Sequence, residues 1–170
     1  MIVQVVPVNY EVVMLTNQLA SAIIAGVLMT HPELPTEPID EVLCVAEAVW
    51  FESSGESVAG KYAVAHVIRN RVKSKRFPNT YCDVVNQPYQ FSYLNQHRPT
   101  VKVINHIDAE ALEWAMKVAI DITNNRLGAD FTYGSEHYFN PSLANPNWRH
   151  YGQEVGMVGN HLFLNQMRNR

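Results

Sequence analysis

The sequence contains few cysteines and few charged residues, and each shortage excludes a class of protein. Two cysteines in 170 residues are too few for a disulfide scaffold, and Cys44 and Cys82 lack the CxxC spacing of a zinc site. They could form a single bridge in an oxidising compartment or stay reduced elsewhere. Charged residues make up only 17% of the chain, and the net charge is −3. Because no basic surface is evident, we expect no nucleic-acid partner.

Long apolar runs are also scarce, and the one candidate lies near the N-terminus. Residues 12–30 carry no charge, and this length approaches the ~20 residues that span a bilayer. Polar residues interrupt the run, and its apolar residues recur at helical spacing: Val12, Leu15, Leu19, Ile23 and Val27. We therefore expect a helix that packs on the core or on a partner, with membrane contact as the less favoured alternative. Residues 1–10 contain no lysine or arginine, so no secretory signal peptide is expected.

The chain does contain enough apolar sequence for one folded domain behind a short N-terminal piece. Apolar residues make up 47% of the chain, and a domain of this length can bury a sizeable core. Three prolines in residues 31–38 predict a stiff connector. We therefore divide the chain into an apolar helix with its connector, residues 1–38, and a main domain, residues 39–170.

Sequence periodicity predicts an α+β fold that is mainly helical. Apolar residues at three- and four-residue steps predict helices over residues 39–51, 58–73 and 109–127, the last capped by Asp108 and stopped by Gly128. Residues 77–103 are expected to form a loop with short helical turns. Strand-like stretches at residues 131–139 and 155–164 predict a small antiparallel β element near the C-terminus.

Glu52 is the residue most suited to acid chemistry. It lies in the last turn of a predicted apolar helix beside Trp50 and Phe51, where partial burial would raise its pKa and keep it protonated at neutral pH. A protonated carboxyl in an apolar wall is how glycosidases deliver a proton to a leaving oxygen. The alternative is a solvent-facing glutamate at a helix end. Glu56 could be a second carboxylate, but we favour a charge that opens the next helix.

Several blocks of residues resemble the spore cortex-lytic and cell wall hydrolase family (SleB/CwlJ type). The resemblance runs in order over residues 41–165 and is carried by Cys44-x-Ala46-x-Ala48-x-x-Phe51-Glu52-x-x-Gly55-Glu56, Gln90-Phe91-Ser92, His137-Tyr138-x-Asn140-Pro141, Pro146-x-Trp148 and Val158-Gly159-Asn160-His161-x-Phe163. One departure is that Ser53-Ser54 stands where the family reads alanine and arginine, which puts an arginine's support of this loop in doubt.

The resemblance implies that residues 39–170 form a lysozyme-like catalytic domain acting on peptidoglycan glycan strands. It implies cleavage between N-acetylmuramic acid and N-acetylglucosamine as a lytic transglycosylase, with Glu52 as the catalytic glutamate. No second carboxylate stands at a motif position, which fits a mechanism that uses one acid, whereas hydrolases normally use two. No cofactor and no metal are expected.

The same blocks supply candidate substrate-binding residues. Gln90, Ser92, Tyr138 and Asn140 offer donors and acceptors for sugar groups, and the alternative is that they fix loops. Phe91 and Trp148 could face a sugar ring or belong to the core. Glu56, His137 and His161 complete the set; a zinc site at His137, His150 and His161 is disfavoured because no HExxH motif occurs.

Three other functions remain open from the sequence alone. They are a muramidase-type hydrolase, a metal-dependent amidase that cuts the muramoyl–alanine bond, and a non-catalytic wall-binding or virion protein. The expected site of action is the bacterial cell wall, reached by a phage enzyme after release from the host cytoplasm or by an ancillary bacterial hydrolase. The sequence does not determine the oligomeric state.

Overall fold

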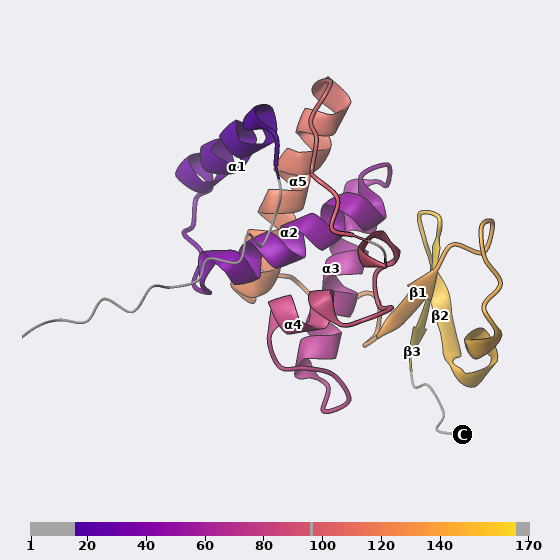
Figure 1. Cartoon of the computed structure of the whole chain (residues 1–170). Helices are drawn as coiled ribbons and strands as arrows, with labels where there is room; N and C mark the ends of the chain where they lie inside the picture. The colour runs from indigo at the N-terminus through magenta and orange to yellow at the C-terminus, as the bar shows by residue number, and fades with distance from the viewer. Residues whose placement is uncertain (1–15, 96, 166–170) are drawn as a thin grey trace, which may run out of the picture.

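A computed structural model describes residues 16–95 and 97–165 of the chain. Helices form one part of the molecule and a small antiparallel sheet forms the other (Figure 1). The elements in chain order are α1 (Gln18–Thr30), α2 (Ile39–Ser53), α3 (Val58–Lys73), α4 (Tyr81–Asn86), η1 (Ser92–Leu94), α5 (His106–Thr123), β1 (His137–Phe139), η2 (Asn147–Tyr151), β2 (Gln153–Val158) and β3 (His161–Asn165). This confirms the prediction of a mainly helical α+β fold with its strands near the C-terminus.

Helix α2 lies at the centre of the helical part and contacts α3, α4 and α5. Its apolar sequence is buried almost all round, because neighbouring helices cover every face. Asp40 and Glu41 occupy its first turn, where the helix dipole favours carboxylates. The prediction ended this helix at about residue 51, and the structure extends it to Ser53.

Helix α2 is tied to α4 by two separate links. Cys44 and Cys82 form a disulfide that joins positions 38 residues apart in the sequence. The Glu41 carboxylate accepts hydrogen bonds from the backbone N–H groups of Tyr81 and Cys82, in the first turn of α4. Of the two alternatives open from sequence, the structure therefore contains the bridged cysteines.

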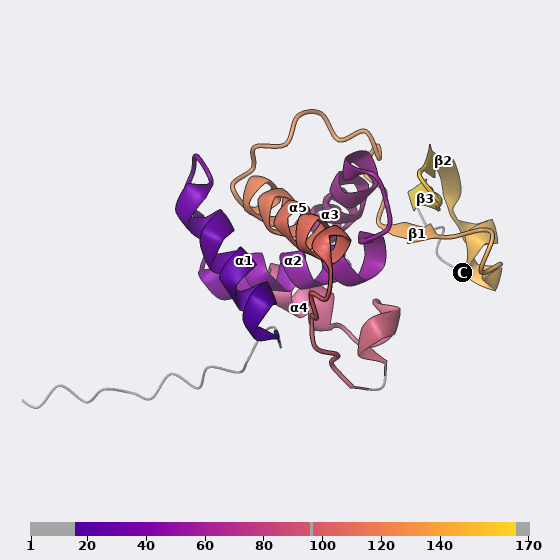
Figure 2. The same ribbon diagram turned by 90° about the horizontal axis from the view of Figure 1, so that it is seen from above.

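Helix α1 packs along α5, at the end of the molecule opposite the sheet (Figures 1 and 2). The Asn17 side chain caps its first turn and also donates to the carbonyl of Val103, while Ala20 and Val27 are buried against the core. Residues 12–15 of the predicted helix lie outside the described residues. Within the described part of the chain, no helix has the length and hydropathy to span a membrane.

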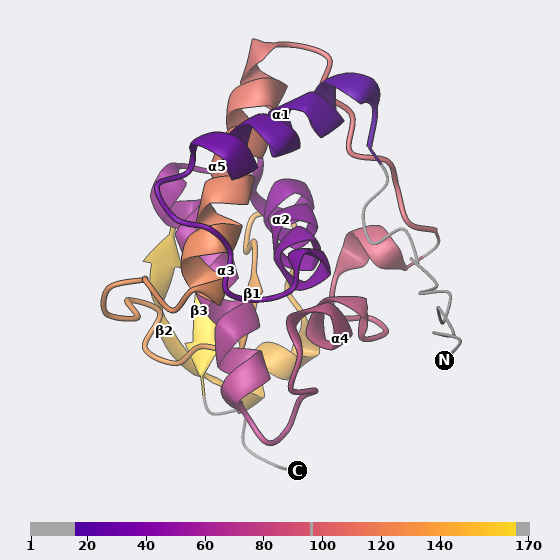
Figure 3. The same cartoon turned by 90° about the vertical axis from the view of Figure 1, so that its left-hand side faces the viewer.

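Helix α5 runs alongside α3 and beneath α1 (Figure 3), and both of its ends differ from the prediction. Asn105 rather than Asp108 is the N-cap. The Asn105 side chain accepts from the Asp108 N–H, and the Asp108 carboxylate accepts from the Asn105 backbone N–H. This capping box starts the helix earlier because it satisfies donors at both residues. The helix then ends at Thr123, where Asn125 takes a left-handed conformation (φ 56°), well before Gly128.

The sheet has the strand order β1-β3-β2 with both pairings antiparallel. The predicted strand over residues 131–139 is wrong except for its last part, because the Asp130 carboxylate accepts backbone N–H bonds from Thr132 and Gly134 and folds this segment into turns. The predicted strand over residues 155–164 is a hairpin: β2 and β3 are separated by a turn at Gly159 and Asn160.

The disulfide should contribute strongly to stability. A bridge that closes a loop of this size typically contributes about 2–4 kcal/mol, mainly by restricting the unfolded chain. We expect the double variant Cys44→Ser, Cys82→Ser to lose that amount of unfolding free energy in urea titrations. Wild-type protein unfolded in reductant is the matched control and should show the same loss, and equal stability with and without reductant would contradict the prediction.

Candidate active site

Glu52 projects from the last turn of α2 toward the sheet. The turn closes normally, with the Ser54 N–H donating to the Trp50 carbonyl. The Glu52 side chain is half-buried, and its Oε2 accepts a hydrogen bond from the Tyr138 hydroxyl of β1 at 2.9 Å. Burial raises the pKa of Glu52, while the Tyr138 hydrogen bond and the charge of Arg71 oppose the rise. The net direction is upward, which favours the protonated acid.

Arg71 of α3 is the cation whose charge acts on the Glu52 carboxyl. Sequence analysis did not assign Arg71 to the site. Only 4% of it is exposed; its Nε donates to the carbonyl of Glu136, and its guanidinium lies 5.4 Å from the ring centres of Phe77 and Phe91. Its Nη1 has no hydrogen-bond partner among the described residues. A buried guanidinium therefore has a donor left for a ligand or for water.

Tyr138 connects Glu52 to His161 of β3. The Tyr138 and His161 rings meet edge to face with centres 5.0 Å apart. The Phe163 ring also packs against the Tyr138 ring. Burial lowers the pKa of His161, so this ring favours the neutral form. Its Nδ1 is buried without a partner among the described residues. The structure thus brings together three predicted residues, Glu52, Tyr138 and His161.

Tyr93 of η1 completes the wall around Glu52, and sequence analysis missed it. Its ring stacks on Phe51 at 4.6 Å between centres, and its hydroxyl is buried without a partner in the described chain. Burial raises the pKa of Tyr93, and the charges of Glu47 and Glu52 raise it further. Arg98, which follows η1 in the sequence, forms an ion pair with the fully buried Glu47 of α2 and so attaches this part of the chain to α2. The position of Tyr93 directly after the Gln-Phe-Ser block was the signal in the sequence that could have identified it.

The Gln90-Phe91-Ser92 block divides between surface and core. Gln90 is half-buried and Ser92 is exposed at the start of η1. Phe91 is only 1% exposed and lies under the Arg71 guanidinium, so its ring belongs to the core and is not accessible to a sugar. Of the two interpretations of Phe91, the structure supports the core one.

His137 and Trp148 lie on the opposite side of β1 from Tyr138, and Asn140 follows the end of the strand. Successive side chains of a strand point to opposite faces, so the His137 ring packs near Trp148, with centres 5.7 Å apart, while Tyr138 reaches Glu52. Burial lowers the pKa of His137 to about 4. The Asn140 side chain accepts from the Ser142 N–H and so shapes a turn.

Glu56 stands at the start of α3 and also holds the β2–β3 turn. Its carboxylate accepts from the backbone N–H of Asn160 at 3.2 Å and from the Asn160 side chain at 2.8 Å. The adjacent Ser57 is the N-cap of α3, so Glu56 stands at the start of this helix as expected and also makes a tertiary contact. This contact fixes the sheet against the loop that follows Glu52.

Lys61 supports that loop where the resemblance predicted the loss of an arginine. Its Nζ donates to the carbonyls of Ser54 and Glu56, at 3.1 and 2.6 Å, and the residue is only 4% exposed. An ammonium group bonded to two loop carbonyls fixes the backbone after Glu52. Across residues 16–95 and 97–165, no three His, Cys, Asp or Glu side chains gather in a way that could hold a metal ion.

The chain is similar to known proteins over most of the described part. The model of the Cell Wall Hydrolase family matches residues 55–164, beginning three residues after Glu52. Spore cortex-lytic enzymes from Bacillus cereus and Bacillus subtilis are 35% and 30% identical over 124 residues, which is 73% of this chain. Those matches cover 44% and 37% of the two relatives, so this chain spans less than half of their length.

Two solved structures share the fold. The catalytic domain of the Bacillus cereus SleB protein has a TM-score of 0.60 and 34% identity, covering 77% of this chain and 94% of that one. The catalytic domain of a germination-specific lytic transglycosylase, SleB from Bacillus anthracis, has a TM-score of 0.63 and 32% identity, covering 76% and 98%. The likeness confirms the predicted fold class, a lysozyme-like helical core with a small antiparallel sheet.

Removing the Tyr138 hydroxyl should raise the pKa of Glu52 further. The hydrogen bond stabilises the ionised carboxylate, so Tyr138→Phe removes an opposing effect and leaves burial to act with less opposition. A ¹³C NMR titration of labelled glutamate side chains measures the shift. Tyr133→Phe, at an exposed tyrosine, is the matched control, and an unchanged or lowered Glu52 pKa in Tyr138→Phe would refute the assigned hydrogen bond.

A side chain at Gly159 should loosen the sheet from the loop after Glu52. Gly159 has φ 57°, and a Cβ added there would overlap Oε2 of Glu56. We expect Gly159→Ala to lower the unfolding free energy by about 1–3 kcal/mol. Gly134→Ala is the control because Gly134 also has a positive φ (79°) and nothing lies within 4 Å of its added Cβ; urea titration of both variants gives the comparison, and equal effects would contradict the Glu56 contact.

Proposed function

This chain belongs to the cell wall hydrolase family, and from that premise we propose that it cleaves peptidoglycan strands as a lytic transglycosylase. The bond is the β-1,4 linkage between N-acetylmuramic acid and N-acetylglucosamine. The observation that carries the proposal is the half-buried Glu52, whose pKa is raised by burial and whose Oε2 is held by Tyr138. A carboxyl whose pKa is raised in this way is suited to general acid catalysis.

In the first step Glu52 acts as an acid. Its carboxyl proton passes to the glycosidic oxygen as the bond from C1 of the muramic sugar to that oxygen breaks. The leaving sugar departs with a new hydroxyl group, and positive charge develops at C1. The carboxylate that forms is stabilised by the Tyr138 hydrogen bond and by the Arg71 charge, both of which lower the pKa of Glu52.

In the second step the same carboxylate acts as a base. It takes the proton from the C6 hydroxyl of the muramic sugar while that oxygen attacks C1. The product is a 1,6-anhydromuramic end, Glu52 regains its proton, and no water is consumed. One carboxyl therefore serves both steps, because it gives up its proton in the first step and takes one back in the second.

The neighbouring carboxylates support a mechanism with one acid. A hydrolase normally needs a second carboxylate, as nucleophile or as base for water. Glu47 pairs with Arg98, Glu136 pairs with Arg76, and Glu56 accepts from Asn160. Each thus has a structural task, and a muramidase-type hydrolase is the alternative that the product analysis below tests.

For substrate contacts we propose the polar groups whose atoms have no partner among the described residues. They are Nη1 of Arg71, the Tyr93 hydroxyl and Nδ1 of His161, together with the accessible Gln90 and Ser92. Hydroxyl and acetamido groups of the sugars would complete their hydrogen bonds. Trp148 and His137 form a second group of rings that we assign to a more distant part of the strand.

The disulfide supports action at the bacterial cell wall. Such bridges persist in oxidising surroundings and are uncommon in reducing cytoplasm. We therefore propose that the chain works after it leaves the cytoplasm, on peptidoglycan as its partner. We assign the catalytic unit to residues 39–170, with α1 as a brace along α5.

The direct test is mass spectrometry of muropeptides released from purified peptidoglycan. Wild type should release anhydromuramic ends, and Glu52→Gln should lower the rate by about 100- to 10,000-fold, the usual contribution of a general acid or base. Glu37→Gln, at an exposed position on the connector, is the control and should leave the rate unchanged. Circular dichroism checks that the Glu52→Gln variant is folded.

Each class of product corresponds to a different reaction. Anhydromuramic ends from wild type and not from Glu52→Gln support the proposal. Reducing muramic ends would replace it with a hydrolase mechanism, and free stem peptides would indicate an amidase. Release of no fragment would indicate a wall-binding protein.

A further inference from the structure

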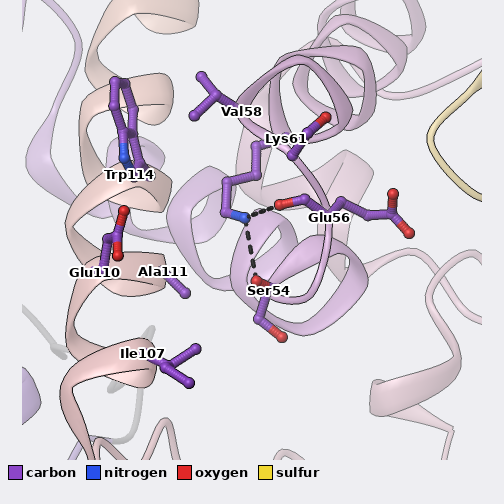
Figure 4. Close-up of a pocket in the computed structure, with 9 residues that line it drawn as sticks. Ser54, Glu56, Val58, Lys61, Ile107, Glu110, Ala111 and Trp114 are labelled. Carbon is purple, nitrogen blue, oxygen red and sulfur yellow. Dashed lines mark hydrogen bonds between the residues drawn. The ribbon is translucent and has the colours of Figure 1, made fainter.

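A cavity of about 260 Å³ lies between α5 and the loop that joins α2 to α3 (Figure 4). We call it the α3–α5 pocket. Ser54 and Lys61 line it on the side of the loop, and Ile107, Glu110 and Trp114 of α5 line the other side. None of these residues has a part in the proton transfers proposed above.

The pocket begins close to the catalytic loop. Ser54 follows Glu52 by two residues, so their Cα atoms are at most about 7 Å apart. The carboxylate of Glu56 points away from Lys61, toward its contact with Asn160, and only its backbone carbonyl reaches the ammonium group (Figure 4). A peptide stem on a glycan strand at Glu52 is longer than this separation, because each extended residue spans about 3.3–3.6 Å, and its end can therefore reach around Ser54 to the pocket.

Lys61 supplies a fixed positive charge with an unused donor. The two loop carbonyls of Ser54 and Glu56 take two of the three N–H groups of an ammonium. The group is almost completely buried and is held in one geometry, so its third N–H is already oriented. Burial lowers the pKa of Lys61, whereas Glu56 and Glu110 oppose this, and an anionic ligand group would oppose it as well.

Glu110 supplies the opposite charge on the facing wall. It is exposed, and within the described residues it makes neither a hydrogen bond nor an ion pair, although its charge acts on Lys61. Its neighbour Glu113 has a different situation, since it pairs with Lys117. The pocket thus presents a carboxylate with no partner in the described chain opposite an ammonium with a spare donor.

Trp114 supplies an apolar surface on the α5 side of the pocket, next to Glu110 (Figure 4). The Nζ of Lys117 lies 5.1 Å from the centre of the Trp114 ring. Lys117 itself is not among the residues that line the pocket. Ile107, 64% exposed, adds a second apolar side chain near the mouth. A ligand that matches all three features carries an ammonium, a carboxylate and a short methylene chain.

We propose that the α3–α5 pocket binds the zwitterionic end of the diamino acid in a peptidoglycan peptide stem. The free ammonium would meet Glu110, the free carboxylate would accept from Lys61, and the methylenes would lie on Trp114. The inference rests on the proposed function, since it names a second part of the same substrate. It makes the enzyme selective for strands that carry stems of this chemistry.

The test is binding of a free stem peptide, which needs no glycosidic cleavage. The probe is L-Ala-γ-D-Glu-diaminopimelate, titrated into the wild-type chain while the indole N–H resonance of Trp114 is followed by NMR; Trp114→Phe assigns the signal. We expect a saturable shift, and a Kd about fivefold weaker or more in Glu110→Gln, the usual effect of losing one charge-assisted contact. Glu113→Gln on the same helix is the matched control and should bind as wild type.

Four outcomes would overturn the inference. They are no shift at millimolar peptide, equal affinity in Glu110→Gln, equal weakening in Glu113→Gln, and equal affinity for the peptide with lysine in place of diaminopimelate, which lacks the side-chain carboxylate. The proposed function fails separately, because it depends on the released muropeptides. Peptide binding without strand cleavage would keep the pocket and reject the transglycosylase, and the reverse would reject only the pocket.

Discussion

Burial of α2 is the constraint on which the rest of the molecule depends. Its sequence is apolar on every side, so it is stable only where α3, α4 and α5 surround it. The disulfide and the Glu41 contact then attach α4 to its first half. Because the helix body is held in this way, its last turn presents Glu52 in one place. A carboxyl at the end of a buried helix loses much of its hydration, and its pKa rises for that reason.

The sheet determines what chemistry this carboxyl can do. Phe163 of β3 packs on Ala63 and Val67 of α3, which docks the strands on the helical part. Glu56 holds the β2–β3 turn at a second point, near the start of α3. With both ends of the sheet located, Tyr138 on β1 meets Glu52 at hydrogen-bond distance. The tyrosine moderates the effect of burial, so the site combines a raised pKa with a partner for the ionised form.

The surroundings of Glu52 contain more buried polar atoms than the described part of the protein satisfies. Nη1 of Arg71, the Tyr93 hydroxyl and Nδ1 of His161 have no partner in the described chain. Most buried polar groups in folded proteins are paired, since an unpaired one costs about 1–3 kcal/mol. These three belong to residues connected to Glu52 through Tyr138, the Arg71 charge or the Phe51 ring, and a polar ligand could complete their hydrogen bonds. The α3–α5 pocket extends the same reasoning along the loop, with Lys61 and Glu110 as the groups that a ligand would complete.

Sequence by itself determined the helical core and the place of Glu52 at a helix end, because both depend on local pattern. Periodic apolar residues specified α2 and α3 closely, and the motif order located the glutamate at a helix end. The ends of α5 and the strand at residues 131–139 were misjudged, since Asn105 and Asp130 formed side-chain bonds that outweighed local propensity. Only the tertiary structure decided that Phe91 is core, that Tyr93 and Arg71 surround Glu52, and that Glu56 holds a turn about a hundred residues away. Those contacts join residues distant in the chain, and their partners are set by how helices and sheet pack, which no local pattern contains.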